Sequence, residues 1–188
     1  VALVAVTTNL AAAAGGLVAM VLTWALVSKK PDLGTTLNGV LAGLVAITAP
    51  CAFVTPAWAL VIGAIGGVIV VYGALLLEKL KIDDPVSAVP VHLMNGIWGT
   101  LAVGIFATEN GVTGLVAGNS AQFLAQLIGV LVVAAWCLAT GGILFYVILK
   151  GWFGLRVTRE EELKGLDVEE HGAEAYPQDV VGSLAAAD

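Results

Sequence analysis

Charged side chains are scarce in this sequence of 188 residues, and their absence from long stretches is its most informative feature. Only 12% of the residues are Asp, Glu, Lys or Arg, whereas 59% are hydrophobic. A soluble domain averages about 25% charged and about 45–50% apolar residues. Between Val1 and Lys150, several uncharged stretches approach the ~20 residues that a helix needs to cross ~30 Å of hydrocarbon. The composition therefore predicts an all-α membrane protein, since a helix satisfies its own backbone in lipid.

Cysteine and histidine are also rare, with two of each. Cys51 falls at the end of one apolar stretch and Cys137 in the middle of another, so we expect no disulfide. Neither cysteine has the neighbours of a zinc site, which favours packing as small apolar side chains. The sequence also lacks a Ser-His-Asp set, paired membrane carboxylates and a phosphate-binding glycine loop. We therefore expect no metal, no cofactor and no enzymatic activity.

The formal net charge of -6 belongs to the end of the chain. Nine of the fourteen acidic residues lie at or after Glu160, so the apolar part is nearly neutral and nothing favours nucleic-acid binding. At the other end, Val1 starts inside an apolar run, without Met and without the pattern of a signal peptide. We interpret this amino end as a cut within a longer polypeptide.

The uncharged stretches predict five membrane-spanning helices, at about 1–27, 36–53, 57–77, 86–107 and 120–149. Residues 1–150 then form a transmembrane domain, and residues 151–188 form a carboxyl-terminal tail. Copies of a unit with an odd number of spans must enter the membrane from opposite sides. Five spans therefore suit one half of an inverted repeat, in which the substrate path runs between the halves.

Basic residues are confined to the loops after the first, third and fifth spans: Lys29, Lys30, Lys79, Lys81, Lys150, Arg156, Arg159 and Lys164. The other side, with Val1 and the loops at Pro56 and Gly111, has none. Cytoplasmic loops carry the excess of Lys and Arg in membrane proteins. The pattern predicts that Val1 is outside and that the tail is cytoplasmic.

His92 is the only ionisable side chain inside a predicted span, about 10 Å deep at about 1.5 Å per residue. An ionisable residue at this depth is costly and suggests a function. The alternative is a neutral imidazole that bonds a neighbouring helix. A neutral ring offers one donor and one acceptor to a small polar molecule. Ala88, Gly96 and Thr100 share its helix face, which leaves room for a narrow path or for a close helix contact.

Three local patterns favour structural roles. Asp84 and Pro85 open the fourth span, where a helix prefers Asp at the N-cap and Pro at its first position. This structural cap is preferred over a direct role in conduction. The tail pattern from Thr158 to Glu161 fits a capping box, and it predicts a short helix that Gly165 would end. The glycine pairs 39/43 and 63/67 favour close helix packing.

Four motifs in order resemble the Amt/Mep/Rh ammonium transporter family. They are NGVLAGLVAITAP at 38–50, IDDPV at 82–86, VHLMNGIWG at 91–99, and a tail with GLRV from Gly154, followed by EE, GLD, HG and Tyr176. The resemblance runs from Asn9 to about Pro177, and the tail is similar to the Amt branch rather than the Rh branch.

The resemblance implies a homotrimer of eleven-helix subunits, each with its own hydrophobic pore. This chain would supply the last five helices and would need the missing amino-terminal half. His92 would be the second of two pore histidines that ammonia passes after ammonium is deprotonated, and Ala88 would line the pore one turn earlier. Asp84 and Pro85 are carried over only as a structural cap near the pore. The outer cation site and the aromatic gate of the family would lie in the absent half.

The resemblance also implies a regulatory tail that packs on the cytoplasmic face, where PII-type proteins dock: Gly154, Arg156, Gly165, Asp167, His171 and Tyr176. The expected function is ammonium/ammonia transport across the plasma or inner membrane. One alternative is an ammonium sensor that signals to a partner. The chain ends eleven residues after Pro177 without a further domain, which favours transport. Another alternative is a membrane scaffold without conduction.

Overall fold

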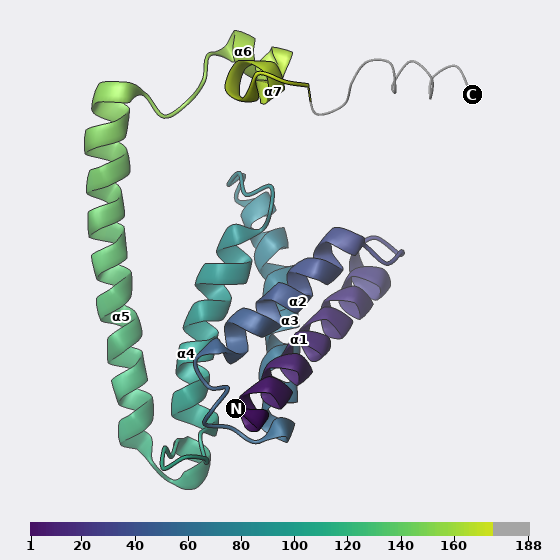
Figure 1. The fold of residues 1–188 in the computed structure, drawn as a ribbon, viewed down its shortest axis with the longest axis vertical. Helices are drawn as coiled ribbons and strands as arrows, with labels where there is room; N and C mark the ends of the chain where they lie inside the picture. Colours follow the sequence, from purple (N-terminus) through teal and green to yellow (C-terminus); the bar gives the residue numbers. More distant parts are fainter. Residues whose placement is uncertain (175–188) are drawn as a thin grey trace. The chain divides into compact units, whose positions relative to one another are not determined.

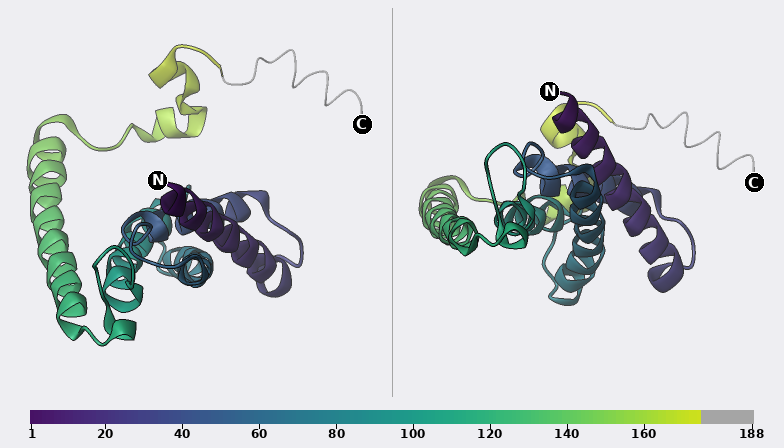
Figure 2. Two further views of the ribbon diagram at one scale, coloured as in Figure 1. Left: turned by 60° about the horizontal axis from the view of Figure 1, so that its bottom comes forward. Right: turned by 90° about the horizontal axis from the view of Figure 1, so that it is seen from below.

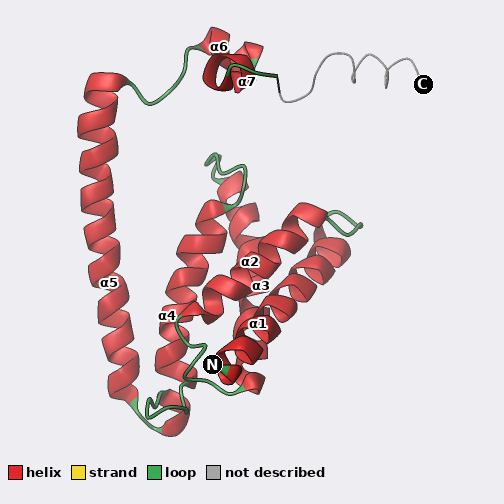
Figure 3. Cartoon of the chain, in the orientation of Figure 1, coloured by secondary structure: helices red, strands yellow, loops and turns green. Residues whose placement is uncertain are grey.

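The computed structural model describes residues 1–174, and the regular elements in that range are all helical (Figure 3). The chain divides into two compact units, Val1–Ala134 and the part from Ala135 onward. The boundary between these units falls inside α5 (Ser120–Gly142). No residue of α5 is buried.

Four helical stretches within the described residues are long and apolar enough to cross a bilayer: Ala2–Val27, Pro56–Lys79, Val89–Phe106 and Ser120–Trp152. The first joins α1 (Ala2–Leu22) to η1 (Thr23–Val27), and the second is α3 (Pro56–Lys79). The third joins η2 (Val89–Met94) to α4 (Asn95–Phe106), and the last joins α5 to η4 (Ile143–Phe153). Four of the five predicted spans therefore have membrane-spanning length.

The remaining apolar helix, α2 (Leu33–Thr48), has 16 residues, which is about 24 Å of helix at about 1.5 Å per residue. It starts earlier than predicted because the Asp32 carboxylate accepts from the backbone N–H of Thr35 at 2.6 Å and caps it. This backbone hydrogen bond, together with one from the Thr35 side chain, holds the pKa of Asp32 below its ordinary value. The helix stops at Thr48 instead of residue 53, since Pro50 has no N–H to continue the helical bonds.

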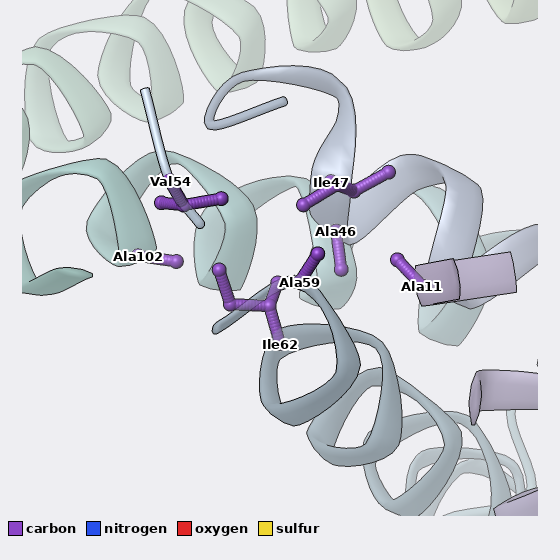
Figure 4. Packing of buried hydrophobic residues seen from close by; sticks show 7 residues of the cluster. All are labelled: Ala11, Ala46, Ile47, Val54, Ala59, Ile62 and Ala102. Atoms are coloured by element: carbon purple, nitrogen blue, oxygen red, sulfur yellow. The ribbon is translucent and has the colours of Figure 1, made fainter. Parts of the chain in front are cut away.

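The first unit is built around α1, which packs against both α2 and α3, while α2 also packs against α3 and α4 (Figures 1 and 2). One end of its core is a cluster of fully buried and mostly small side chains (Figure 4): Ala11, Ala46, Ile47, Val54, Ala59, Ile62 and Ala102. The small side chains let the helices approach closely, and glycines on the same faces bring them closer still.

Glycines mark the contacts of α2 and α3 with α1. A Cβ added at Gly43 or at Gly63 would collide with the Ala11 carbonyl, and one added at Gly39 or Gly67 would meet the Gly15 carbonyl. The interpretation of the two sequence pairs as packing contacts is confirmed. Close contact matters in lipid, because the bilayer supplies little hydrophobic drive between helices.

Loops alternate between the two ends of the first unit. At one end the Asn110 amide donates to the Ala52 carbonyl, and the Thr7 hydroxyl donates to the Cys51 carbonyl at 2.8 Å. The amino end, the α2–α3 turn and the loop after α4 therefore lie together. The opposite end carries the loops after α1 and α3 (Figure 1), and there the loop after α3 lines one cavity together with Thr23 and Val27 of η1 and Thr35 of α2. This is the alternation that the predicted spans require.

The glycine contacts generate a stability prediction. We expect Gly43→Ala to destabilise the complete protein by about 1–3 kcal/mol, because the added methyl group overpacks the α1–α2 contact. The measurement is the thermal unfolding midpoint of the purified protein in detergent. Gly34→Ala, on the same helix, is the control, since its Cβ would meet nothing closer than 3.5 Å. Equal midpoints for the two variants would contradict the packing role of Gly43.

Candidate functional site

His92 lies in η2, a π-helical segment that continues directly into α4. Its side chain and that of Ala88 are exposed, and a Cβ added at Gly96 would meet nothing within 4 Å. The neighbouring Pro90 and Val91 are buried. One face of the segment is therefore packed and the other, which carries His92, is open in this chain.

The start of this segment differs from the sequence expectation. The carboxylate of Asp84 accepts from the backbone N–H of Ala88 at 2.7 Å and from that of Val89 at 2.8 Å, so it satisfies donors at the helix start. The helix begins at 88–89 rather than at residue 86, and Pro85 lies in a turn instead of at the first helical position. The reason is Ser87, whose φ of +58° breaks the helical path before the helix begins.

Two further polar side chains support η2. Pro90 has no N–H, and the Asn38 amide of α2 donates instead to the carbonyl of Val86, four residues earlier, at 3.4 Å. Asn95 is fully buried, and its amide donates to the Pro90 carbonyl at 2.9 Å. The sequence pattern alone does not indicate this role of Asn95. The available signal was an amide side chain one turn after His92 in an apolar helix.

The second unit contains the predicted capping box. The Thr158 N–H donates to the Glu161 carboxylate at 2.7 Å, and the Glu161 N–H donates to the Thr158 hydroxyl at 3.3 Å. The first of these bonds holds the pKa of Glu161 below its ordinary value. They open α6 (Arg159–Lys164), which ends at Gly165 with φ +97°. The predicted start and end of this helix are both confirmed.

The remaining tail residues singled out in the sequence are spread along this second unit. Gly154 has φ +78° and follows η4, and Arg156 forms an exposed ion pair within the tail. Asp167 lies in the first turn of α7 (Leu166–His171), and His171 lies in its last turn. Tyr176 lies outside the described residues. His92 and Ala88 belong to the first unit, so the predicted residues fall into two separate groups.

Metal-ligating side chains are dispersed in the described part of the chain. Residues 1–174 contain no group of three or more His, Cys, Asp or Glu side chains that could hold a metal ion. Cys51 and Cys137 are both free.

Apolar helices of membrane-spanning length, tightly packed through glycine and carrying one exposed histidine, define a multi-pass α-helical membrane protein. The sequence model of the Ammonium Transporter Family matches residues 1–176, and the chain belongs to this family. It is 53% identical to ammonium transporter Amt2 of Archaeoglobus fulgidus over 94% of this chain and 39% of that protein. It is 36% identical to an ammonium transporter of Bacillus subtilis over 91% of this chain and 43% of that protein.

The comparison with solved structures also finds Amt and Mep proteins. A structure described as a sensor Amt protein superposes with a TM-score of 0.80 and 42% identity over 90% of this chain and 42% of its own. Mep2 of Saccharomyces cerevisiae superposes with a TM-score of 0.77 and 30% identity over 84% of this chain and 37% of its own. The chain thus spans less than half the length of each of these relatives.

The backbone at Gly165 generates a prediction for the tail. A side chain at φ +97° and ψ 149° is strained, and we expect Gly165→Val to destabilise the end of α6 by about 1–3 kcal/mol. Hydrogen exchange at the amides of 161–165 should then accelerate in the complete protein. Gly151→Val is the control, because Gly151 has no positive φ and open space around it. Unchanged exchange in Gly165→Val would show that the tail tolerates a side chain here.

Proposed function

We propose that this chain supplies the second half of an ammonium/ammonia transporter, with His92 and Ala88 lining the path. Membership of the ammonium transporter family supports the substrate. The position of His92 supports the site: an imidazole within a membrane-spanning helix is costly in contact with lipid, yet here it stands on the open face of its helix. A path between this face and a second half would give the ring a polar environment.

In this proposal the unpacked face of η2 and α4 meets an amino-terminal half of opposite orientation. The chain covers only 39% of the archaeal Amt2 relative, which leaves room in a complete protein for such a half. We count α2 as a membrane span as well, which brings the total to five. It runs beside α1, and the loops at its two ends lie at opposite ends of the first unit. The complete subunit would then have eleven helices, and it would assemble as a homotrimer.

His92 would act as a neutral imidazole, accepting from or donating to ammonia as it passes. Ala88 would keep the path narrow and apolar without contributing a polar group. Asp84 would act as a structural cap, since its two oxygens already accept from backbone N–H groups of Ala88 and Val89. Pro85 would support the turn that brings this carboxylate to the helix start.

The tail would lie in the cytoplasm, below the plasma or inner membrane, because basic residues are confined to one set of loops. The regulatory surface of the tail would consist of the residues singled out in the sequence: Gly154, Arg156, Gly165, Asp167, His171 and Tyr176. A PII-type protein that docks on the cytoplasmic face would meet this surface.

The second candidate function is an ammonium sensor. It is favoured by the superposition on a structure described as a sensor Amt protein, at 42% identity. The two functions differ in flux: a sensor would bind ammonium and alter a partner without sustained passage. Uptake by the complete protein in liposomes separates them, since saturable uptake supports the transporter.

His92→Ala is the decisive variant for the transport proposal. We expect it to abolish or strongly change methylammonium uptake by the complete protein in liposomes, while expression and oligomeric state stay the same. The reason is that His92 supplies the polar group on the small-residue face. His171→Ala is the matched control in liposomes that contain no PII-type protein, because His171 lies in the tail helix α7. Unchanged uptake in His92→Ala would make this ring structural and would end the pore assignment.

Orientation can be measured by cysteine labelling of intact cells. In a background without Cys51 and Cys137, we expect an impermeant thiol reagent to label Gly111→Cys but not Glu170→Cys. After permeabilisation both should react, because both are exposed. Labelling of Glu170→Cys alone in intact cells would reverse the proposed orientation.

A further inference from the structure

Asn95 is the most deeply buried polar side chain next to the candidate site. It is 0% exposed, and its Nδ2 donates to the Pro90 carbonyl at 2.9 Å and to the Gly66 carbonyl of α3 at 3.4 Å. Its Oδ1 has no hydrogen-bond partner in the described part of the chain. A buried unpaired acceptor is destabilising. An unpaired buried acceptor of this kind is expected mainly at functional or strained sites. The two hydrogen bonds that the Asn95 amide donates indicate what holds it there.

The donor holds an unusual stretch of backbone. Pro90 lies inside η2, where the π-helical turns are wider than those of an α-helix. Such turns are rare and are found mostly at functional sites. The Asn95 side chain reaches back five residues to the Pro90 carbonyl and ties the end of the π-helical segment to its beginning. The same amide ties the segment to the neighbouring helix through Gly66.

The surface of α3 is shaped to receive this segment. A Cβ added at Gly66 would lie 2.9 Å from Asn95 Oδ1. Seven residues further along α3, a Cβ added at Gly73 would lie 2.8 Å from Met94 Sδ and 3.0 Å from Pro90 Cβ. Glycine at these two positions thus admits the packed face of η2. With that face against α3, His92 is left on the opposite, exposed face.

We propose that Asn95 is a positioning residue that fixes the direction of the His92 imidazole by locking the π-helical segment against α3. This inference rests on the proposed function in one respect, that His92 is the group being aimed. If the π-helical turns relaxed to an α-helix, the register would shift by one residue, which turns a side chain by about 100° around the axis. A turn of that size would remove His92 from the face that it now occupies.

The test compares Asn95→Leu with Trp98→Phe in the complete protein. Leucine matches the size of asparagine but removes the donor. Trp98 lies one turn further along α4, and its Nε1 donates to the Ile62 carbonyl of α3 at 3.1 Å. Trp98→Phe therefore deletes an α4–α3 hydrogen bond of the same kind outside the π-helical segment. Two measurements are made on each variant: methylammonium uptake at equal protein abundance, and the ring ¹⁵N signals of His92, assigned with His92→Gln.

We expect Asn95→Leu to move the His92 ring signals and to lower the uptake rate about tenfold, because small misplacements of a working group have large effects on rate. Trp98→Phe should leave the His92 signals in place. Unmoved His92 signals in folded Asn95→Leu would overturn the proposal. If the leucine variant does not fold, Asn95→Ala, which cannot clash, takes its place with the same two outcomes.

Gly66→Ala provides an independent arm, since its methyl group would press on the Asn95 amide. It should move the His92 signals in the same direction as Asn95→Leu, and unmoved signals would count against the proposal. The two hypotheses remain separable. Unchanged uptake in His92→Ala refutes the pore assignment. In that case the His92 ring signals of Asn95→Leu still decide whether Asn95 positions His92. Lost uptake in His92→Ala with unmoved signals in Asn95→Leu refutes only the positioning role.

Discussion

The close approach of α1 to α2 and α3 is the constraint on which the rest of the first unit depends. Gly43 of α2 and Gly63 of α3 both lie against the Ala11 carbonyl, so any side chain there would push two helices away from α1. Lipid supplies little hydrophobic drive between helices, and van der Waals contact at short range takes its place. Because α3 is held in this way, Gly66 and Gly73 of α3 face α4 and η2.

The two faces of η2 explain how a polar group can be presented in an apolar protein. On the packed face, Asn95 and Pro90 lie against α3, and their hydrogen bond stays inside the protein. On the other face, His92 has the small residues Ala88 and Gly96 four positions away on either side. At the helix start, Asp84 satisfies two backbone donors, which leaves the segment fixed at both ends. The histidine is therefore carried by a rigid element rather than by a loop.

The helix ends in the tail, unlike the helix contacts of the first unit, are set by residues close together in the sequence. The capping box from Thr158 to Glu161 and the positive φ of Gly165 involve residues within eight positions of one another. Such features can be predicted from sequence, since they need no partner from elsewhere in the chain. The predicted helix start at residue 86 was wrong, although it too rested on a local pattern. Asp84 and Pro85 fit an N-terminal pattern, but the left-handed Ser87 moves the helix start by two to three residues.

The sequence by itself determined the helical class, four helices of membrane-spanning length, the packing role of the glycine pairs and the short tail helix. Each of these follows from hydrophobic length, residue size or local hydrogen bonding. Only the tertiary structure decided that η2 is π-helical and that Asn95 is buried against Gly66. These features depend on which helix faces meet, and residues 29 positions apart meet only after the helices have packed.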